Sequence, residues 1–254
     1  MKRTWWAIAL AGALLLAGCS SSPSSGSGAK GGKLTVLAAS SLTGTFQTLA
    51  ATFEKQHPGV KVVFSFDSSA TLAEQVTQGA PADVLATADT KTMQTVVDAK
   101  QNDGTPKLFA SNTLVLVVPK DNPAGITSFG DLQKPKVSWI MCVTTAPCGS
   151  LAQTELAANH ITNNPKSQEV DVKSVLAKVD AGEVDAGIVY ASDAKSDAAN
   201  VTPIPIPNSA QFINHYPIVA LTGSKNPTLA HEWVDLVLSA KGRQVLGTAG
   251  FGKP

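Results

Sequence analysis

The chain has 254 residues, with 20 basic and 19 acidic side chains and a formal net charge of +1. This balance excludes the strongly basic surface that attracts nucleic acids or anionic membranes. Hydrophobic residues make up 43% of the chain and charged residues only 15%. This composition indicates a well-packed α/β protein with one large or two modest domains.

The first residues have the pattern of an export signal. Two basic residues precede an apolar stretch, residues 5–16, that is too short to span a bilayer. The sequence Leu-Ala-Gly-Cys follows at 16–19 and is typical of the site where bacterial lipoproteins are cleaved and lipidated. We therefore predict a signal peptide at residues 1–18 and a lipid-bearing Cys19. The alternative is an ordinary secretory peptide with an incidental cysteine.

The segment that follows is rich in serine and glycine and has almost nothing to bury. Residues 19–33 are therefore predicted to be a lipidated N-terminus with a flexible linker. Loss of Lys2 and Arg3 with the signal peptide leaves 18 of the 20 basic residues against 19 acidic ones. We expect an extracytoplasmic protein, held by its lipid to the outer face of the cell membrane.

The next part of the chain alternates between strand and helix patterns. Apolar residues at helical spacing follow the first strand, and Pro58-Gly59 is expected to end that helix. The elements expected here are strands at 34–39, 60–66 and 84–88 and helices at 42–57, 69–78 and 89–99. This βαβαβα order predicts a parallel sheet covered by helices on both faces.

A continuous apolar strand at 114–119 leaves this block, and a second α/β block follows. Its expected elements are helices at 128–133, 149–159 and 172–180, strands at 137–143 and 186–190, and an extended piece at 202–207. A second crossing strand at 218–221 and helices at 228–240 and 241–246 complete the chain.

Two crossings between two α/β blocks predict a two-lobed hinge protein. We expect residues 34–115 plus 216–254 in lobe 1 and residues 116–215 in lobe 2. The fold class is α/β with mostly parallel sheets.

Cys142 and Cys148 are the two cysteines that remain beside Cys19. In an oxidising compartment this close pair predicts a disulfide that closes a small loop, with two free buried thiols as the alternative. The four histidines show no metal-ligand spacing with the cysteines or with one another, so no metal site is predicted.

Hydroxyl side chains are concentrated where two expected strands run into helices. The first strand leads into Ser40-Ser41-Leu42-Thr43, and the second into Asp67-Ser68-Ser69-Ala70-Thr71. Open parallel sheets bind ligands at these strand ends, where free N–H groups and the positive helix end attract anions. The alternative is that each serine only caps its helix.

Three features of the second block could face the same place. Residues 146–150 precede a helix, Asp171-Val172 opens the next one, and Tyr190 ends a strand. Their structural alternatives are a connecting turn, an ordinary Asp cap and a tyrosine at the edge of the core.

Several stretches together resemble the molybdate-binding proteins of bacterial ABC importers, in order and across nearly the whole folded region. They are LAASSLTGTF (37–46), FDSSATLAEQV (66–76), GAPADVLATAD (79–89), NTLVLVVP (112–119), GEVDAGIVYASDA (182–194) and AGF (249–251). The resemblance implies a periplasmic-binding-protein fold of type II. In that fold a tetrahedral oxyanion, molybdate or tungstate, is held between the lobes by hydrogen bonds alone.

The family's binding positions can be transferred residue by residue. They imply hydroxyl donors at Ser41, Ser69 and Tyr190 and backbone N–H donors at Cys148 and Val172. The resemblance also implies an ABC permease and its ATPase as partners, no catalysis, no cofactor and no metal beyond the bound oxyanion. We expect a monomer that contacts the membrane only through its lipid.

Two positions depart from the family pattern. Cys148 stands where better-known members have alanine, but a backbone donor tolerates this change. Asp67 stands where a small residue is expected, and we predict that it points to solvent or caps the helix. If it faced the cleft, it would repel a dianion and favour hydrogenphosphate.

Two other functions remain open at this stage. Sulfate or phosphate could replace molybdate, because the donor chemistry is shared. A secreted hydrolase is the alternative from another class, although the Gly-x-Ser-x-Gly motif of α/β-hydrolases is absent. An iron site of this fold would need several tyrosines, and the chain has only Tyr190 and Tyr216.

Overall fold

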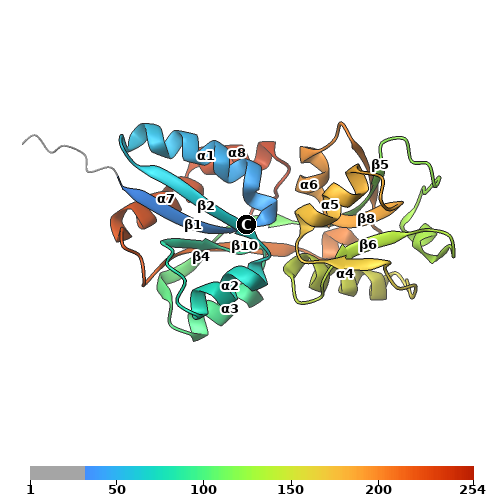
Figure 1. Ribbon diagram of the computed structural model, residues 1–254, viewed down its shortest axis with the longest axis horizontal. Helices are drawn as coiled ribbons and strands as arrows, with labels where there is room; N and C mark the ends of the chain where they lie inside the picture. The colour runs from blue at the N-terminus through green and yellow to red at the C-terminus, as the bar shows by residue number, and fades with distance from the viewer. Residues whose placement is uncertain (1–31) are drawn as a thin grey trace, which may run out of the picture.

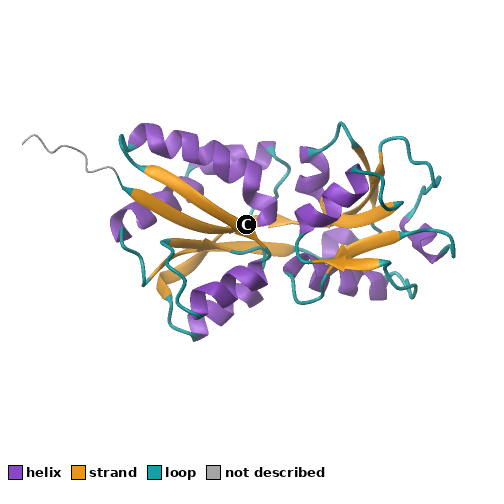
Figure 2. Ribbon diagram, viewed as in Figure 1, coloured by secondary structure: helices purple, strands orange, loops and turns teal. Residues whose placement is uncertain are grey.

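The computed structural model describes residues 32–254, in two lobes that lie side by side (Figure 1). Each lobe contains a five-stranded sheet with helices packed around it (Figure 2). The predicted signal peptide, the lipidated Cys19 and most of the linker lie outside the described residues. Within the described range, no helix combines the length and the apolar character needed to cross a membrane.

Lobe 1 contains the N-terminal part of the chain and its C-terminal end. Its elements are β1 (Lys33–Ala39), η1 (Ser40–Leu42), α1 (Thr43–Gln56), β2 (Lys61–Asp67), α2 (Ser69–Thr77), β3 (Val84–Ala86), α3 (Thr90–Asp98), β4 (Asn102–Asn112), β10 (Asn214–Leu221), α7 (Pro227–Leu238) and α8 (Ala240–Thr248). The sheet has the strand order β2-β1-β3-β10-β4.

Lobe 2 contains the middle of the chain. Its elements are β5 (Leu114–Pro119), η2 (Phe129–Gln133), β6 (Trp139–Cys142), α4 (Pro147–Ala158), β7 (Ser167–Glu169), α5 (Val172–Asp180), β8 (Ala186–Tyr190), α6 (Ala191–Ser196), β9 (Val201–Pro205) and η3 (Ser209–Gln211). The sheet has the strand order β7-β6-β8-β5-β9.

Each sheet is mixed because of one reversed strand. β10 runs antiparallel to β3 and β4 in lobe 1, and β5 runs antiparallel to β8 and β9 in lobe 2. The other neighbours pair in parallel. The reversed strand is in each case the one by which the chain arrives from the other lobe. This reversed strand starts at the side of its sheet that faces the other lobe, whereas the parallel strands of the same sheet end at that side.

Two short links join the lobes. Thr113 separates β4 from β5, and residues 206–213 separate β9 from β10. The strands that the sequence places at the crossings therefore flank these links. The division into residues 34–115 plus 216–254 and residues 116–215 stays a prediction.

Helix α1 illustrates how local sequence determines an element. Phe46, Leu49, Ala50 and Phe53 recur at helical spacing and are buried on one face. The helix ends at Gln56, before a glycine at 59 with a φ of 88°. Two strands escape prediction, β4 and β7. β4 contains Asn, Asp, Gly and Pro, which disfavour strands, and β7 is a three-residue polar segment, SQE. Their pairing partners hold both in the sheets.

The core of lobe 1 is built around aromatic rings. The indole of Trp233 meets Phe46 and Phe53 at ring-centroid distances of 5.5 Å, and both contacts are edge-on. Such pairs add about 0.5–1.5 kcal/mol each beyond the area they bury. This packing fixes α1 and α7 on the sheet, and with them the β1–α1 junction that faces lobe 2.

Candidate functional site

A small cavity lies between the lobes, where the ends of several strands meet. It measures about 210 Å³ out to its mouth. Its lining residues are Ala39, Ser40, Ser41, Asp67, Ser68, Ser69 and Ala88 from lobe 1 and Ala146, Pro147, Cys148, Asp171, Val172 and Tyr190 from lobe 2. The structure thus brings all five predicted ligand residues together around one space.

The two serines of lobe 1 are neighbours because of strand register. β1 and β2 pair in parallel from Lys33↔Lys61 to Ala39↔Asp67, so both strands end at the same level. Ser41 and Ser69 are each the second residue after these ends and are 6% and 1% exposed. Two junctions that are 28 positions apart in sequence therefore present their hydroxyls side by side.

Neither serine caps a helix, which excludes the simpler interpretation of these junctions. No side-chain cap is present at the start of η1, α1 or α2. Instead, the Ser69 hydroxyl accepts the backbone N–H of Ala88 at 2.9 Å. Ser41 Oγ lies 3.1 Å from the phenol oxygen of Tyr216. The Ser69 hydroxyl accepts the one bond from Ala88 and therefore keeps its own proton free to donate into the cavity.

Cys148 lies in the first turn of α4 and is joined to Cys142, the last residue of β6, by a disulfide. The first N–H groups of a helix have no partner within it, and among the described residues none accepts from Cys148. Gly149 permits this tight loop, because a Cβ there would lie 2.0 Å from the carbonyl oxygen of Val143. The disulfide and the glycine together hold the Cys148 N–H at the cavity.

Val172 is the first residue of α5, and its helix is capped by Asp171. The Asp171 carboxylate accepts the N–H groups of Lys173 at 2.7 Å and Ser174 at 3.1 Å. It also accepts the Ser174 hydroxyl at 3.1 Å. The cap leaves the N–H of Val172 without an acceptor among the described residues, so this donor remains available at the cavity wall.

Tyr190 ends β8 and is only 1% exposed. Its phenol oxygen accepts the side-chain amide of Asn214 at 2.7 Å, so its partner is a side chain rather than the backbone. Burial raises the pKa of Tyr190 well above its ordinary value, with a further contribution from Tyr216. The phenol is therefore neutral and keeps its proton for donation into the cavity.

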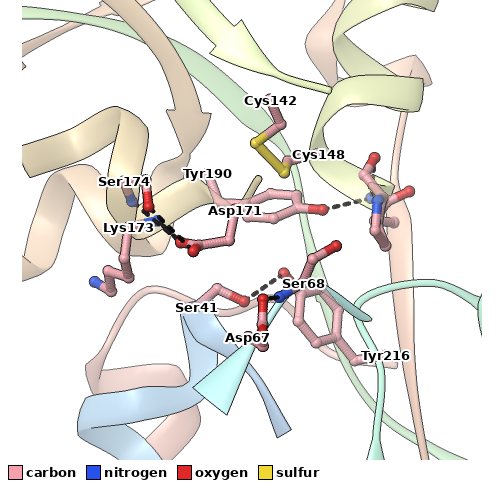
Figure 3. The surroundings of a disulfide bond; sticks show 12 residues. Ser41, Asp67, Ser68, Cys142, Cys148, Asp171, Lys173, Ser174, Tyr190 and Tyr216 are labelled. Carbon is pink, nitrogen blue, oxygen red and sulfur yellow. Dashed lines mark hydrogen bonds between the residues drawn. A yellow bond between two sulfur atoms is a disulfide. The ribbon is translucent and has the colours of Figure 1, made fainter. Parts of the chain in front are cut away.

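Asp67 is half-buried, borders the cavity and does not cap α2. The prediction that it could cap this helix is therefore wrong, and its pointing to solvent stays a prediction. The N-cap position belongs to Ser68. The Asp67 carboxylate accepts the N–H of Ser68 at 2.6 Å. Figure 3 shows Asp67 on the lobe 1 side of the site, opposite Asp171 and Tyr190 of lobe 2. Two carboxylates thus lie at the wall, and only that of Asp171 is fully used by helix capping.

Among residues 32–254, no lysine, arginine or histidine lines the cavity. The nearby Lys173 instead pairs with the buried carboxylate of Asp193, at 2.9 Å. Within residues 32–254, no group of three or more His, Cys, Asp or Glu side chains could hold a metal ion. The site can therefore act on an anion only through neutral donors and helix ends, which suits an ion that accepts hydrogen bonds.

From residue 34 to residue 252 the chain matches a family described as bacterial extracellular solute-binding proteins. The chain belongs to this family. The solute-binding protein is 42% identical to the molybdate-binding protein ModA of Mycobacterium tuberculosis H37Rv, over 96% of this chain and 95% of the relative. The resemblance drawn from the sequence motifs is thereby confirmed.

Solved structures of solute-binding proteins share the fold. The substrate-binding domain of a putative molybdenum ABC transporter from Clostridium difficile is 26% identical, with a TM-score of 0.66 over 88% of this chain and 99% of that chain. The sulfate-binding protein SubI of M. tuberculosis reaches a TM-score of 0.76 over 86% of each chain. At 19% identity, this second likeness shows the fold alone. The predicted fold class is confirmed.

Sequence reasoning missed the residues behind the solute-binding protein's donors. Asn214 and Tyr216 lie in β10 just after the second link, and they contact Tyr190 and Ser41. Asn214 also donates to the carbonyl of Pro147, at 3.2 Å. Their position at the start of the returning strand is the one sequence signal that could have found them.

Proposed function

We propose that this solute-binding protein captures molybdate or tungstate in the interlobe cavity and delivers it to an ABC importer. The observation that carries the proposal is the convergence of five donors from both lobes on a cavity without a cation. Ser41, Ser69 and Tyr190 donate hydroxyl protons, and Cys148 and Val172 donate backbone N–H groups. Molybdate is a dianion that only accepts, so it matches this set.

The free energies of the individual hydrogen bonds imply that tight binding needs donors from both lobes. A hydrogen bond to a charged group contributes about 1.5–3 kcal/mol, so the two serines alone would contribute about 3–6 kcal/mol. Loss of translational and rotational freedom costs at least about 4 kcal/mol. Lobe 1 by itself would therefore bind weakly, and tight binding needs closure of the lobes around one ion. We infer hinge closure, without catalysis or a cofactor, as the mechanism.

Tethering and delivery belong to the same proposal. A lipid on Cys19, followed by a flexible linker to residue 33, would keep a monomeric protein at the outer face of the membrane. There it would meet the permease, whose ATPase works from the other side. A Cys19→Ser variant should be secreted rather than retained in the membrane fraction, and retention of this variant would contradict the lipid anchor.

Calorimetric titration with molybdate, tungstate, sulfate and phosphate tests the ligand, using the mature protein with Cys19→Ser. We expect sub-micromolar affinity for molybdate or tungstate and much weaker binding of sulfate, selected by size because the donor chemistry is shared. Tight phosphate binding without a molybdate response would overturn the proposal.

Sulfate and phosphate are the second candidates. Sulfate accepts from the same donors as molybdate, and the Asp67 carboxylate at the cavity could accept the proton of hydrogenphosphate. The Asp67→Asn variant separates the cases. Removal of the negative charge should tighten molybdate binding several-fold, whereas it should weaken binding if hydrogenphosphate is the ligand.

A further inference from the structure

The side chain of Ser68 is buried, although its hydroxyl makes no hydrogen bond to any described residue. The residue is 4% exposed, and its Oγ has no hydrogen-bond partner among the described residues. At the N-cap of α2, which is nine residues long, a serine ordinarily accepts an N–H of the first turn. That bond is absent here. Because an unpaired buried hydroxyl is costly, a partner outside the chain would offset that cost.

The backbone around Ser68 is held by two hydrogen bonds. Its N–H donates to the Asp67 carboxylate at 2.6 Å, and its carbonyl accepts the N–H of Leu72 at 3.0 Å. The neighbouring Ser69 hydroxyl already accepts from Ala88. Ser68 lines the same cavity as Ser41 and Ser69, and Figure 3 shows it beside Ser41 and Asp67 on the lobe 1 side of the site.

We propose that Ser68 Oγ is a further donor to the oxyanion, so that lobe 1 presents three hydroxyls rather than two. This inference rests on the proposed function. The hydroxyl proton has no acceptor in the described chain, and a fully deprotonated dianion supplies one at the cavity. Ser68 would then leave its helix uncapped in order to donate to the ligand, which makes it an affinity-determining residue.

Titration of a Ser68→Ala variant with molybdate tests this inference. We expect the dissociation constant to rise at least tenfold, while the melting temperature of the ligand-free protein stays unchanged or rises because an unpaired buried hydroxyl is lost. Should Ser68→Ala fail to fold, Ser68→Gly removes the same hydroxyl and is tolerated at an N-cap.

Ser138→Ala is the matched control. Ser138 Oγ is also buried and without a partner among the described residues, but it precedes β6 at the end opposite Cys142 and does not line the cavity. Its removal should leave the affinity unchanged. Equal effects of the two variants, or wild-type affinity in Ser68→Ala, would overturn the inference and leave the proposed function intact. Failure of the wild-type protein to bind any tetrahedral oxyanion would instead overturn the proposed function.

Discussion

The two lobes present different kinds of donor to the same cavity. Lobe 1 contributes serine side chains, each oriented by a hydrogen bond from behind. Lobe 2 contributes helix N–H groups at Cys148 and Val172 together with one phenol. A side-chain donor is lost with its residue, whereas a backbone donor survives substitution and depends on the loop that holds it. Substitutions of the serines in lobe 1 should therefore weaken ligand binding more than substitutions of Cys148 or Val172 in lobe 2.

Removal of the Ser69 hydroxyl should have the largest effect on binding. Loss of a charge-assisted bond of about 1.5–3 kcal/mol predicts that Ser69→Ala weakens molybdate binding about 10- to 150-fold, measured by calorimetry. Thr77→Ala, at the far end of the same helix, is the control and should bind like the wild type. Unchanged affinity in Ser69→Ala would mean that Ser69 serves only to hold the Ala88 N–H.

Removal of the disulfide tests how far the loop that carries the Cys148 N–H depends on this bond for stability and ligand binding. Replacement of Cys142 and Cys148 by serine should lower the free energy of unfolding by about 2 kcal/mol, because the small closed loop no longer restricts the unfolded chain. Binding should weaken less than tenfold, since the N–H of residue 148 remains. Urea unfolding and titration, each with and without reductant, measure both quantities. Complete loss of binding would contradict a backbone donor here.

The pH dependence of stability should originate in lobe 2. Glu155 on α4 is fully buried without a partner among the described residues, and burial raises its pKa to about 8 from 4.5. Between these values the unfolded state releases the proton and the folded state keeps it. Stability should therefore fall as pH rises from about 5 to 8, by up to about 1.4 kcal/mol per pH unit.

The Glu155→Gln variant should remove this slope in thermal unfolding scans. Molybdate affinity should stay flat over the same range, because the donors at the cavity do not titrate there: the pKa of Tyr190 lies well above its ordinary value. A slope that persists in Glu155→Gln would assign the effect to another group.

The smallest effect on binding is expected at Val172. Its side chain is buried, so Val172→Ala should cost about 1–2 kcal/mol of stability. Its N–H is unchanged, so the dissociation constant should stay within about twofold of the wild type in the same titration. A tenfold loss would show that the side chain, and not the backbone, matters at this position.

Local patterns were sufficient for many elements. α5 and β8 have the bounds expected from the sequence, because Asp171 caps the helix and the strand is a short apolar run. β4 and β7 were missed, since polar and turn-forming residues become strands there only through pairing with β10 and β6.

The sequence by itself determined where hydroxyls and helix starts follow strands, because periodicity and composition act within a few residues. The tertiary structure decided that these junctions meet. The register that sets Ala39 opposite Asp67 aligns the two serine junctions, and the facing lobe 2 adds its N–H groups. It also supplied the groups that orient the donors, such as Tyr216 against Ser41, 175 positions away in sequence. A contact over that separation leaves no local pattern, so only the folded chain could reveal it.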